Sequence, residues 1–387
     1  MAKIREIILL FLVLLNFNLI AQEISVGAEK TDKYLPILLN KRVGIIANQT
    51  SVIKDTHLVD SLIKLDINIK KVFSPEHGFR GKKDAGERFD NKIDEKTGLP
   101  IISLYGENKK PSKKQLKNID ILVFDIQDVG VRFYTYISTL HYVMEAAAEE
   151  DIPLILLDRT NPNRHYIDGP ILEKEYKSFV GMHPVPIVYG MTIGEYAKMI
   201  NGEKWINKRC DLTIIPIDNY KNNIKHILKI APSPNLPNAK SINLYPSLCL
   251  FEGTNMSVGR GTEYPFQHFG SPNQESLYSF IPKSTEGSKN PKHKDTECFG
   301  VDLRSYPYYL SSINLEWVIK SYIKSNNKSN FFNPFFDTLT GTDQIRNQII
   351  NGKTSEEIKR NWQEGISKFM EIRNKYLIYK DFNTLPG

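Results

Sequence analysis

The sequence predicts an α/β protein with a mostly parallel, buried sheet and a smaller second domain. Short apolar runs alternate with amphipathic stretches from about residue 40 onward, and the run "IDILVFDIQDVG", with "ILVF" at its centre, is the strongest signal of a buried strand. After about residue 230 the chain becomes rich in proline and has no long apolar run. Nearly continuous apolar strands are typical of parallel sheets whose two faces are both covered. We therefore expect helices on both faces of the sheet.

Six apolar runs are expected to be strands, because each is short and bounded by polar or turn residues. They span 42–50, 67–75, 99–106, 119–130, 152–162 and 210–217. Stretches between them have apolar residues at helical spacing, and Asp55 and Thr192 are the expected N-caps of two of these helices. The expected helices span 55–65, 137–151 and 192–203.

The chain after residue 230 predicts a smaller domain of α+β class. Its first stretch, "APSPNLPNAKSINLYPS", is rich in proline and is interpreted as a linker or a loop packed on the first domain. Residues 284–297 are polar and irregular, which indicates an exposed loop, whereas 314–325 and 355–377 have helical spacing. The expected domains are 22–230 and 231–387.

Residues 1–21 have the three-part pattern of a secretory signal peptide. Lys3 and Arg5 precede an apolar run at 7–15, and a small residue, Ala21, follows it. The run is short for a membrane span, which needs about 20 apolar residues. We expect cleavage near Ala21 and a periplasmic or secreted protein, with a retained membrane anchor as the alternative.

Composition and motif content argue against several classes of function. The formal net charge is +7, and the basic runs lack interleaved aromatic residues, so we interpret them as a solvated surface rather than a nucleic-acid site. The first expected strand carries no dinucleotide fingerprint, and the chain has no phosphate-binding loop and no Gly-x-Ser-x-Gly elbow.

The cysteines and histidines do not have the spacing of a metal site. Cys210, Cys249 and Cys298 are expected to be small buried residues rather than nucleophiles. Ligation of a metal by His57, His77 and Asp125 is conceivable, but no spacing supports it.

Polar residues gather where the expected strands end, and again in a glycine-rich segment further on. Ligands of parallel sheets bind beyond the carboxyl ends of the strands, so the first three clusters should meet at one edge of the sheet. In "FSPEHGFRG" the cluster is Glu76, His77 and Arg80. The other clusters are Asp125, Asp128, Arg132, Tyr134 and Tyr136; Asp158, Arg159, Asn161 and Asn163; and Glu252, Asn255, Arg260 and Glu263.

These clusters also have structural interpretations. Asp158 and Arg159 are more simply explained as an ion pair at a strand end, and His141 as a structural residue on a helix face. Asp125 lies in an apolar strand, where a carboxylate is costly to bury unless it is paired or hydrogen-bonded. It therefore either caps a neighbouring backbone or takes part in chemistry.

Carboxylates, arginines, aromatic rings and amides around one cleft suit carbohydrate chemistry. In glycoside hydrolysis, a carboxyl group with a raised pKa protonates the leaving oxygen, and a second group handles charge on the other side of the sugar. The residue types of the clusters therefore favour a glycosidase.

A series of long motifs resembles one known family. In chain order they are "VGIIANQTSV", "FSPEHGFRG", "DAGE", "TGLPIISLYG", "DILVFDIQDVGVRFYTYISTL", "LDRTNPN", "DGPILE", "GMHPVPIVYGMTIGEYAKMING" and "LYPSLCLFEGTNMSVGRGTEYPFQHFGSP". They are similar to the exo-β-N-acetylmuramidase family, long catalogued as a domain of unknown function. The resemblance runs from about residue 40 to the C-terminus.

The resemblance implies a Rossmann-like α/β domain, a smaller C-terminal domain and an active site in the cleft between them. It implies an exo-acting glycoside hydrolase that releases N-acetylmuramic acid (MurNAc) from the non-reducing end of peptidoglycan fragments during cell-wall turnover. An example is the disaccharide of MurNAc and N-acetylglucosamine (GlcNAc). It implies no metal and no nucleotide cofactor. The expected partners are saccharides that contain MurNAc, without nucleic acid and without a stable membrane anchor.

The resemblance also implies roles for individual residues. Glu76 is the expected catalytic acid/base, and Asp125 is the expected second catalytic residue. The expected substrate-binding residues are His77, Arg132, Tyr134, Tyr136, Asn161, Glu252, Asn255, Arg260 and Glu263.

The lactyl ether of MurNAc bears a carboxylate, and a planar guanidinium matches a carboxylate in bidentate fashion. Arg132 or Arg260 is the natural candidate to bind it. Tyr134 and Tyr136 would face the same side if their segment is extended, and both could stack on or hydrogen-bond to the sugar.

Two other classes of function stay open at this stage. A non-catalytic periplasmic protein that binds sugars or muropeptides would also suit two lobes and a cleft, although carboxylates at both Glu76 and Asp125 favour chemistry. An esterase or amidase acting on the same polymer would need a serine nucleophile or a zinc site, and the sequence shows neither.

Overall fold

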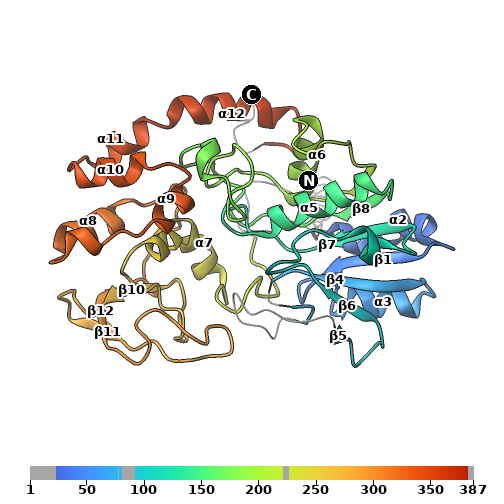
Figure 1. Cartoon of the computed structure of the whole chain (residues 1–387), viewed down its shortest axis with the longest axis horizontal. Coiled ribbons are helices and arrows are strands. Elements are labelled where there is room, and N and C mark those ends of the chain that lie inside the picture. Colours follow the sequence, from blue (N-terminus) through green and yellow to red (C-terminus); the bar gives the residue numbers. More distant parts are fainter. Residues whose placement is uncertain (1–22, 77, 81–91, 221–225, 382–387) are drawn as a thin grey trace, which may run out of the picture.

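The computed structural model describes residues 23–76, 78–80, 92–220 and 226–381. The predicted signal peptide and His77 lie outside these residues. Figure 1 shows a sheet with its helices in blue to green, and beside it a second part in yellow to red. No helix in the described part of the chain is both long and apolar enough to cross a membrane.

The first part is built on a seven-stranded sheet with the order β5-β6-β4-β1-β7-β8-β9. All neighbouring strands are parallel except β5 and β6. From the central β1 the chain winds outward to β4 and β6 and then returns to build β7, β8 and β9 on the other side, which is the doubly wound arrangement. The strands are β1 (Val43–Ala47), β4 (Ile69–Ser74), β5 (Lys92–Ile93), β6 (Pro100–Ser103), β7 (Ile121–Asp125), β8 (Leu154–Leu157) and β9 (Leu212–Ile215).

The two faces of this sheet have separate hydrophobic cores. Ile121 and Val123 of β7 belong to the core that also contains residues of α2 (Thr31–Leu38) and α3 (Leu58–Lys64). Leu122 and Phe124 belong to the core that contains residues of α5 (Tyr136–Glu149) and α6 (Ile193–Gly202). Successive residues of a strand point to opposite faces, so a continuously apolar strand is buried on both sides. The predicted α/β fold class is thereby confirmed.

Each of the six predicted strands contains an observed strand, but one predicted helix cap is wrong. Thr192 caps α6: its hydroxyl accepts the backbone N–H of Glu195. Asp55 does not cap α3, because 52–57 form a small hairpin of β2 (Val52–Ile53) and β3 (Thr56–His57). The helix begins after the hairpin, and the ring of His57 accepts the N–H of Val59 at 3.2 Å instead.

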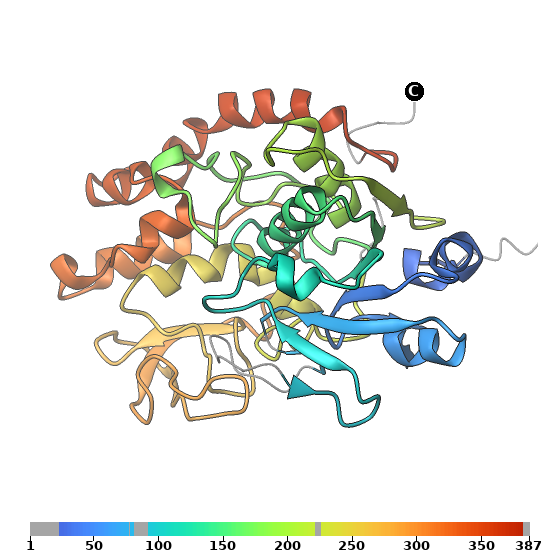
Figure 2. The same ribbon diagram turned by 45° about the vertical axis from the view of Figure 1, so that its right-hand side comes forward.

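The second part combines a three-stranded antiparallel sheet, ordered β10-β12-β11, with helices. Both views place this sheet below the helices of the second part (Figures 1 and 2). Its elements are α7 (Ala239–Leu248), β10 (His268–Ser271), β11 (Tyr278–Phe280), β12 (Cys298–Asp302), α8 (Glu316–Lys324), α9 (Phe335–Thr340), α10 (Gln344–Ile350), α11 (Ser355–Arg360) and α12 (Gln363–Asn374). This α+β character agrees with the predicted class.

Two predictions for the second part need correction. The stretch predicted as one helix at 355–377 is two helices, α11 and α12. The proline-rich stretch predicted as a linker or loop contains α7, which starts after Asn238, whose side chain accepts the N–H of Ser241. The sequence misses α7 because it is short and contains a proline, Pro246. The expected domain boundary at residue 230 stays a prediction.

The last helix returns to the first part. Arg373 of α12 donates to the carbonyl of Gly190 at 2.7 Å, and the hydroxyl of Tyr376 donates to Glu203 at 2.6 Å. The core on the α5 and α6 side of the sheet also continues into the second part, where it includes Phe251 of the short helix η3 (Cys249–Gly253). The two parts therefore share one apolar core.

Two histidines are buried together behind α5. His183 Nε2 lies 2.9 Å from His141 Nδ1, and His183 stacks on Trp205 with ring centroids 4.3 Å apart. Burial lowers the pKa of His141 to about 4. It lowers the pKa of His183 well below its ordinary value, with the charge of His141 as a second cause. Both rings are therefore neutral in the folded protein near neutral pH.

Acidification is expected to lower the free energy of unfolding between about pH 6.5 and about pH 4. In that window the unfolded chain protonates His141 and His183 while the folded chain keeps them neutral. Protonation therefore stabilises the unfolded state relative to the folded one. Urea titrations across this window measure the slope. A double variant, His141→Gln with His183→Gln, should have a shallower slope whatever its stability at neutral pH. Equal slopes in the two proteins would contradict this account.

Candidate active site

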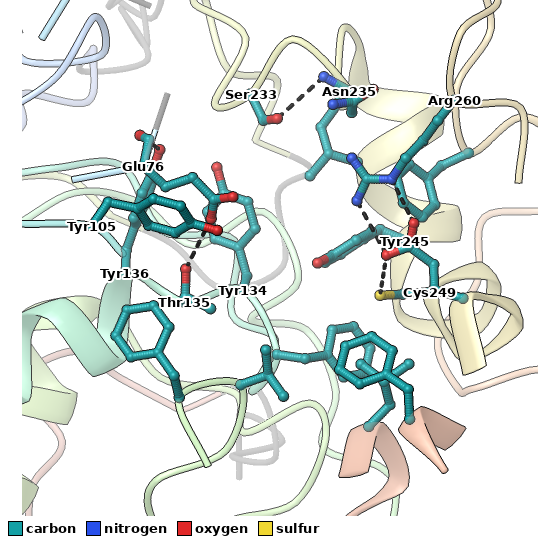
Figure 3. A pocket seen from close by; sticks show the side chains of 18 residues that line it. Glu76, Tyr105, Tyr134, Thr135, Tyr136, Ser233, Asn235, Tyr245, Cys249 and Arg260 are labelled. Atoms are coloured by element: carbon teal, nitrogen blue, oxygen red, sulfur yellow. Dashed lines mark hydrogen bonds and ion pairs between the residues drawn. The ribbon is translucent and has the colours of Figure 1, made fainter. Parts of the chain in front are cut away.

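A cavity of about 180 Å³ lies between the two parts of the molecule (Figure 3). One wall comes from the segments that follow β4, β6 and β7, at the carboxyl edge of the sheet, where doubly wound folds bind ligands. The other wall comes from the second part and from the proline-rich stretch before α7. Its polar lining is Glu76, Tyr105, Tyr134, Thr135, Tyr136, Ser233, Asn235, Tyr245, Cys249, Glu252 and Arg260.

Glu76 reaches the cavity from the turn that follows β4. The backbone N–H of Gly78 donates to the carbonyl of Pro75 at 3.2 Å, and Gly78 has a φ of 77°. The hydroxyl of Thr135 donates to Oε2 of Glu76 at 3.4 Å, and that of Tyr136 donates to the backbone carbonyl of Glu76 at 3.5 Å. Glu76 is half-buried. The turn and the start of α5 thus hold a carboxylate at the cavity surface.

Tyr134 and Tyr136 line the same wall. Their rings meet edge to face with centroids 4.8 Å apart, and Tyr245 lies 6.0 Å from Tyr134 in the same manner. Tyr134 donates to the carbonyl of Pro232 at 2.8 Å, and Tyr136 accepts the side-chain N–H of Asn48 at 3.0 Å. Burial raises the pKa of both phenols above the ordinary range, so both stay protonated.

The tyrosines reach the cavity from a turn rather than a strand. The N–H of Tyr134 donates to the carbonyl of Val131 at 2.9 Å, and α5 begins at Tyr136. The segment of Tyr134 and Tyr136 is therefore not extended, as the prediction that both rings face the same side of a strand required. The helix start, rather than strand alternation, brings the two rings together.

Glu252 and Arg260 form an ion pair on the opposite wall. Arg260 Nε donates to Glu252 Oε1 at 2.5 Å, and Nη2 donates to Oε2 at 3.2 Å. The guanidinium also lies over the ring of Phe266, 5.0 Å from its centroid. Burial by itself lowers the pKa of Arg260, but the charge and hydrogen bonds of Glu252 outweigh it and raise that pKa.

Two glycines aim Arg260 into the cavity. Gly259 and Gly261 have φ angles of 76° and 80°, which side-chain-bearing residues rarely adopt. A Cβ at Gly259 would come within 2.2 Å of the ring of His268, and one at Gly261 within 2.3 Å of the carbonyl of Lys283. The segment is a tight turn, and the turn directs the guanidinium of Arg260 into the cavity.

Part of the Arg260 guanidinium remains available. It has five N–H donors, of which Glu252 takes one from Nε and one from Nη2. No other acceptor contacts it within the parts of the chain described above. Figure 3 shows the guanidinium across the cavity from Glu76. A ligand between the two would meet a carboxylate on one side and N–H donors on the other.

Several lining residues were not predicted. Ser233 and Asn235 come from the proline-rich stretch, and Asn235 donates to the carbonyl of Gly287 at 2.7 Å, which ties that stretch to the second part. Tyr245 and Cys249 come from the end of α7 and the start of η3. Neither segment follows a predicted strand, and for this reason the sequence did not indicate these four residues as part of the site.

The cysteines behave as expected. Cys210, Cys249 and Cys298 are all free and buried. Burial, and next the charge of Glu252, raise the pKa of Cys249 well above its ordinary value, so the thiol in the cavity wall stays protonated. A thiol of this kind is a poor nucleophile.

Asp125 lies outside the cavity wall and is fully buried. Arg159 donates to it from Nε at 2.5 Å and from Nη2 at 2.8 Å, and Arg159 Nη2 also donates to the carbonyl of Val52 at 3.0 Å. The structure thus places Asp125 in a bidentate ion pair outside the lining of the cavity, and its catalytic role stays a prediction. Its position at the end of an apolar strand is explained by this pairing. The partner that the sequence suggested for Arg159, Asp158, is instead bound by Thr192 and Gly194.

Arg132 is also buried away from the cavity wall. Its Nη1 donates to the carbonyls of Pro170 and Val185 at 2.9 and 2.6 Å, and its Nη2 donates to those of Leu339 and Thr340 at 3.1 and 2.6 Å. Burial without a carboxylate partner lowers its pKa to about 9. This arrangement joins the two parts of the molecule, so of the two candidate arginines Arg260 is the one that lines the cavity.

Three further predicted site residues do not line the cavity. Asn161 is buried and donates to the carbonyl of Met191 at 2.8 Å. The backbone carbonyl of Asn255 accepts from the ring of His293 at 2.6 Å. Glu263 is exposed to solvent.

The assembled cavity combines acid/base and recognition groups. Glu76 and Glu252 are its carboxylates, one bound by a hydroxyl and one by a guanidinium. No group of three histidine, cysteine or acidic residues with the geometry of a metal site occurs in the described chain. The tyrosines offer hydroxyl donors and aromatic faces. This set can bind a polar, carboxylate-bearing molecule and transfer a proton to it.

Comparison with known proteins identifies the family. Residues 43–240 match the model "Exo-beta-N-acetylmuramidase NamZ, N-terminal", and residues 243–379 match the corresponding C-terminal model. The peptidoglycan beta-N-acetylmuramidase NamZ of Bacillus subtilis (strain 168) is 41% identical over 376 residues, which cover 89% of each chain.

Two crystal structures of DUF1343 family proteins from Bacteroides fragilis NCTC 9343 are similar to the whole fold. One is 47% identical, with a TM-score of 0.86 over 93% of this chain and 100% of that one. The other is 30% identical, with a TM-score of 0.81 over 92% and 99% of the two chains. The motif resemblance is thereby confirmed: the protein belongs to the exo-β-N-acetylmuramidase NamZ family.

Proposed function

We propose that the protein is an exo-acting β-N-acetylmuramidase that releases MurNAc from the non-reducing ends of peptidoglycan fragments such as MurNAc–GlcNAc. The observation that carries this proposal is the cavity at the sheet edge, which sets Glu76 opposite Arg260 and lines the space between with tyrosines. The identity of 41% to a peptidoglycan β-N-acetylmuramidase supports the same assignment.

Glu76 is proposed to donate a proton to the glycosidic oxygen as the bond to the anomeric carbon breaks. The leaving sugar departs with that proton and with the electron pair of the broken C–O bond. Water supplies the hydroxyl group that the anomeric carbon of MurNAc gains, and the proton that this water loses restores the acid form of Glu76 by the end of the cycle. The hydroxyl of Thr135, at 3.4 Å, holds the carboxyl group in place before and after the transfer. The anomeric configuration of the released MurNAc, followed by NMR, separates retention from inversion.

Arg260 is proposed to bind the lactyl carboxylate that distinguishes MurNAc from GlcNAc. Glu252 fixes the guanidinium along the Nε and Nη2 edge, so the remaining N–H groups can donate to a second carboxylate end-on. Because Glu252 already offsets the charge of Arg260, selectivity would come from directed hydrogen bonds more than from net charge.

A double variant, Arg260→Gln with Glu252→Gln, is expected to lower kcat/KM on MurNAc–GlcNAc by about tenfold or more, through loss of charge-assisted hydrogen bonds. Replacing both partners avoids leaving an unpaired carboxylate in the cavity. Inhibition by free MurNAc should weaken in the variant, whereas inhibition by free GlcNAc should change little. The matched control is Arg346→Gln with Asp337→Gln, which removes a similar pair outside the cavity. Equal loss of affinity for both sugars would argue against lactyl recognition.

Product analysis tests the proposed activity directly. The purified protein is incubated with MurNAc–GlcNAc and with purified peptidoglycan chains, and the products are identified by mass spectrometry. We expect single MurNAc residues from both substrates. Release of larger fragments would indicate an endo-acting enzyme, and intact substrate with measurable binding would indicate a binding protein.

We also propose that the protein acts outside the cytoplasm, in the periplasm or after secretion, in cell-wall turnover and recycling. The support is the signal-peptide pattern of residues 1–21. Fractionation followed by N-terminal sequencing should find a mature chain that begins near Gln22. A chain that keeps residues 1–21 and fractionates with membranes would favour an anchor instead.

A further inference from the structure

The turn that supplies Arg260 and Phe266 to the cavity carries an exposed tyrosine on its outer side. Tyr264 is 37% exposed, and it is not among the cavity-lining residues. Tyr264 is two residues from Phe266, so their Cα atoms are at most about 7 Å apart. An exposed aromatic residue therefore branches from the same turn as two residues of the cavity wall.

Arg304 backs this ring. Its guanidinium carbon lies 4.7 Å from the ring centroid of Tyr264 and 5.7 Å from that of Tyr278. Asp302, at the end of β12, holds the guanidinium through Nη2 at 2.8 Å and Nε at 3.0 Å. The pair is partly exposed, with 42% of the Arg304 side chain and 28% of the Asp302 side chain accessible. Packing of a cation against tyrosine rings stabilises their arrangement.

A chain of hydrogen bonds fixes the backbone beneath the ring. The hydroxyl of Thr262 donates to the carbonyl of Gly259 at 2.7 Å and accepts the N–H of Tyr264 at 3.1 Å. The ring of His268 lies 2.9 Å from the same hydroxyl through Nε2 and 2.6 Å from the hydroxyl of Tyr278 through Nδ1. The exposed ring is thus held in place before any ligand arrives, and a preorganised contact costs less entropy on binding.

An exposed ring beside the cavity could bind the part of the substrate that an exo-acting enzyme leaves outside its cavity. Only the terminal MurNAc has to enter the cavity, and the rest of the glycan must leave over its rim. Amino sugars linked β-1,4 present flat C–H faces that pack on aromatic rings, and every second sugar carries another lactyl carboxylate. A tyrosine stacked on a partly exposed arginine offers both contacts.

We propose that Tyr264, backed by Arg304, forms a binding subsite for sugars of the leaving glycan chain, on the reducing-end side of the bond that is cut. This inference rests on the proposed muramidase function and extends it to substrate length. In this proposal the outer side of the turn binds the leaving glycan chain, and the inner side binds the terminal sugar.

The test compares a long and a short substrate. The long substrate is a peptidoglycan tetrasaccharide with a non-reducing MurNAc, and the short one is an aryl β-glycoside of MurNAc, which has no leaving sugar. For Tyr264→Ala we expect the ratio of kcat/KM on the long substrate to that on the short one to fall about tenfold. Loss of one aromatic stacking contact corresponds to changes of this order. Tyr264→Phe keeps the ring and should restore the ratio.

Tyr308→Ala is the matched control, because Tyr308 is 67% exposed in the same part of the molecule and packs against Tyr306. Its ratio should equal that of the wild type. An unchanged ratio in Tyr264→Ala, or an equal fall in Tyr264→Phe, would overturn the subsite while leaving the muramidase assignment intact. Failure of the wild type to cleave either substrate would refute the proposed function, and the subsite with it.

Discussion

Replacing Glu76 by glutamine is expected to lower kcat on MurNAc–GlcNAc by about 10²–10⁴-fold, the usual contribution of a positioned general acid. Glutamine has the same shape and can still accept the hydrogen bond from the hydroxyl of Thr135, so the local structure should persist. It cannot donate a proton that the leaving oxygen would keep. Steady-state kinetics and thermal unfolding, measured on the same preparation, separate loss of chemistry from loss of fold.

The aryl glycoside sharpens this test. An activated aryl leaving group departs with little need for protonation, so Glu76→Gln should lose less activity on it than on the disaccharide. Glu371→Gln, an exposed substitution of the same kind on α12, serves as the control and should match the wild type on both substrates. Wild-type turnover of MurNAc–GlcNAc by Glu76→Gln would show that another group is the acid.

The second large effect concerns stability. Asp125→Asn is expected to reduce the free energy of unfolding by about 3–5 kcal/mol, because it leaves the guanidinium of Arg159 buried without its compensating charge. In the folded protein the two side chains are 0% and 6% exposed and joined by two hydrogen bonds. Urea unfolding monitored by circular dichroism gives this value.

Two comparisons decide what Asp125 does. Removing both charges, with Asp125→Leu and Arg159→Met, should recover much of the lost stability, since it leaves no unpaired group. Asp120→Asn breaks a pair with Arg42 whose side chains are 31% and 45% exposed, and should cost far less stability than Asp125→Asn. Should Asp125→Asn instead keep full stability and lose turnover, the catalytic role expected from the sequence would be correct.

Some of the site could be predicted because it lies at strand ends. Glu76, Tyr134 and Tyr136 lie in the segments that follow β4 and β7, and the edge of a parallel sheet gathers such residues whatever the details of packing. Glu252 and Arg260 could be predicted for a different reason, since Gly259 and Gly261 indicate a turn and a turn presents its side chains.

Other predicted site residues lie away from the cavity wall, because residue type does not reveal a partner. Arg132 looked suited to a lactyl carboxylate, but four backbone carbonyls from 170, 185, 339 and 340 surround its guanidinium. Asn161 was expected to bind substrate, but its side-chain amide donates a hydrogen bond to the carbonyl of Met191. Segments distant in the chain supply these acceptors, so no local pattern could indicate them.

From the order of residues alone one obtains the α/β class, the six parallel strands, the family and the carboxylate of Glu76. These follow from periodicity along short segments and from long motifs, both of which are local properties of the chain. Tertiary packing alone decides that Arg260 faces the cavity while Arg132 does not, that Asp125 is paired with Arg159, and that the proline-rich stretch with Ser233 and Asn235 completes the wall. Those outcomes depend on which distant groups satisfy each buried charge and hydrogen bond, and only the folded chain brings such groups together.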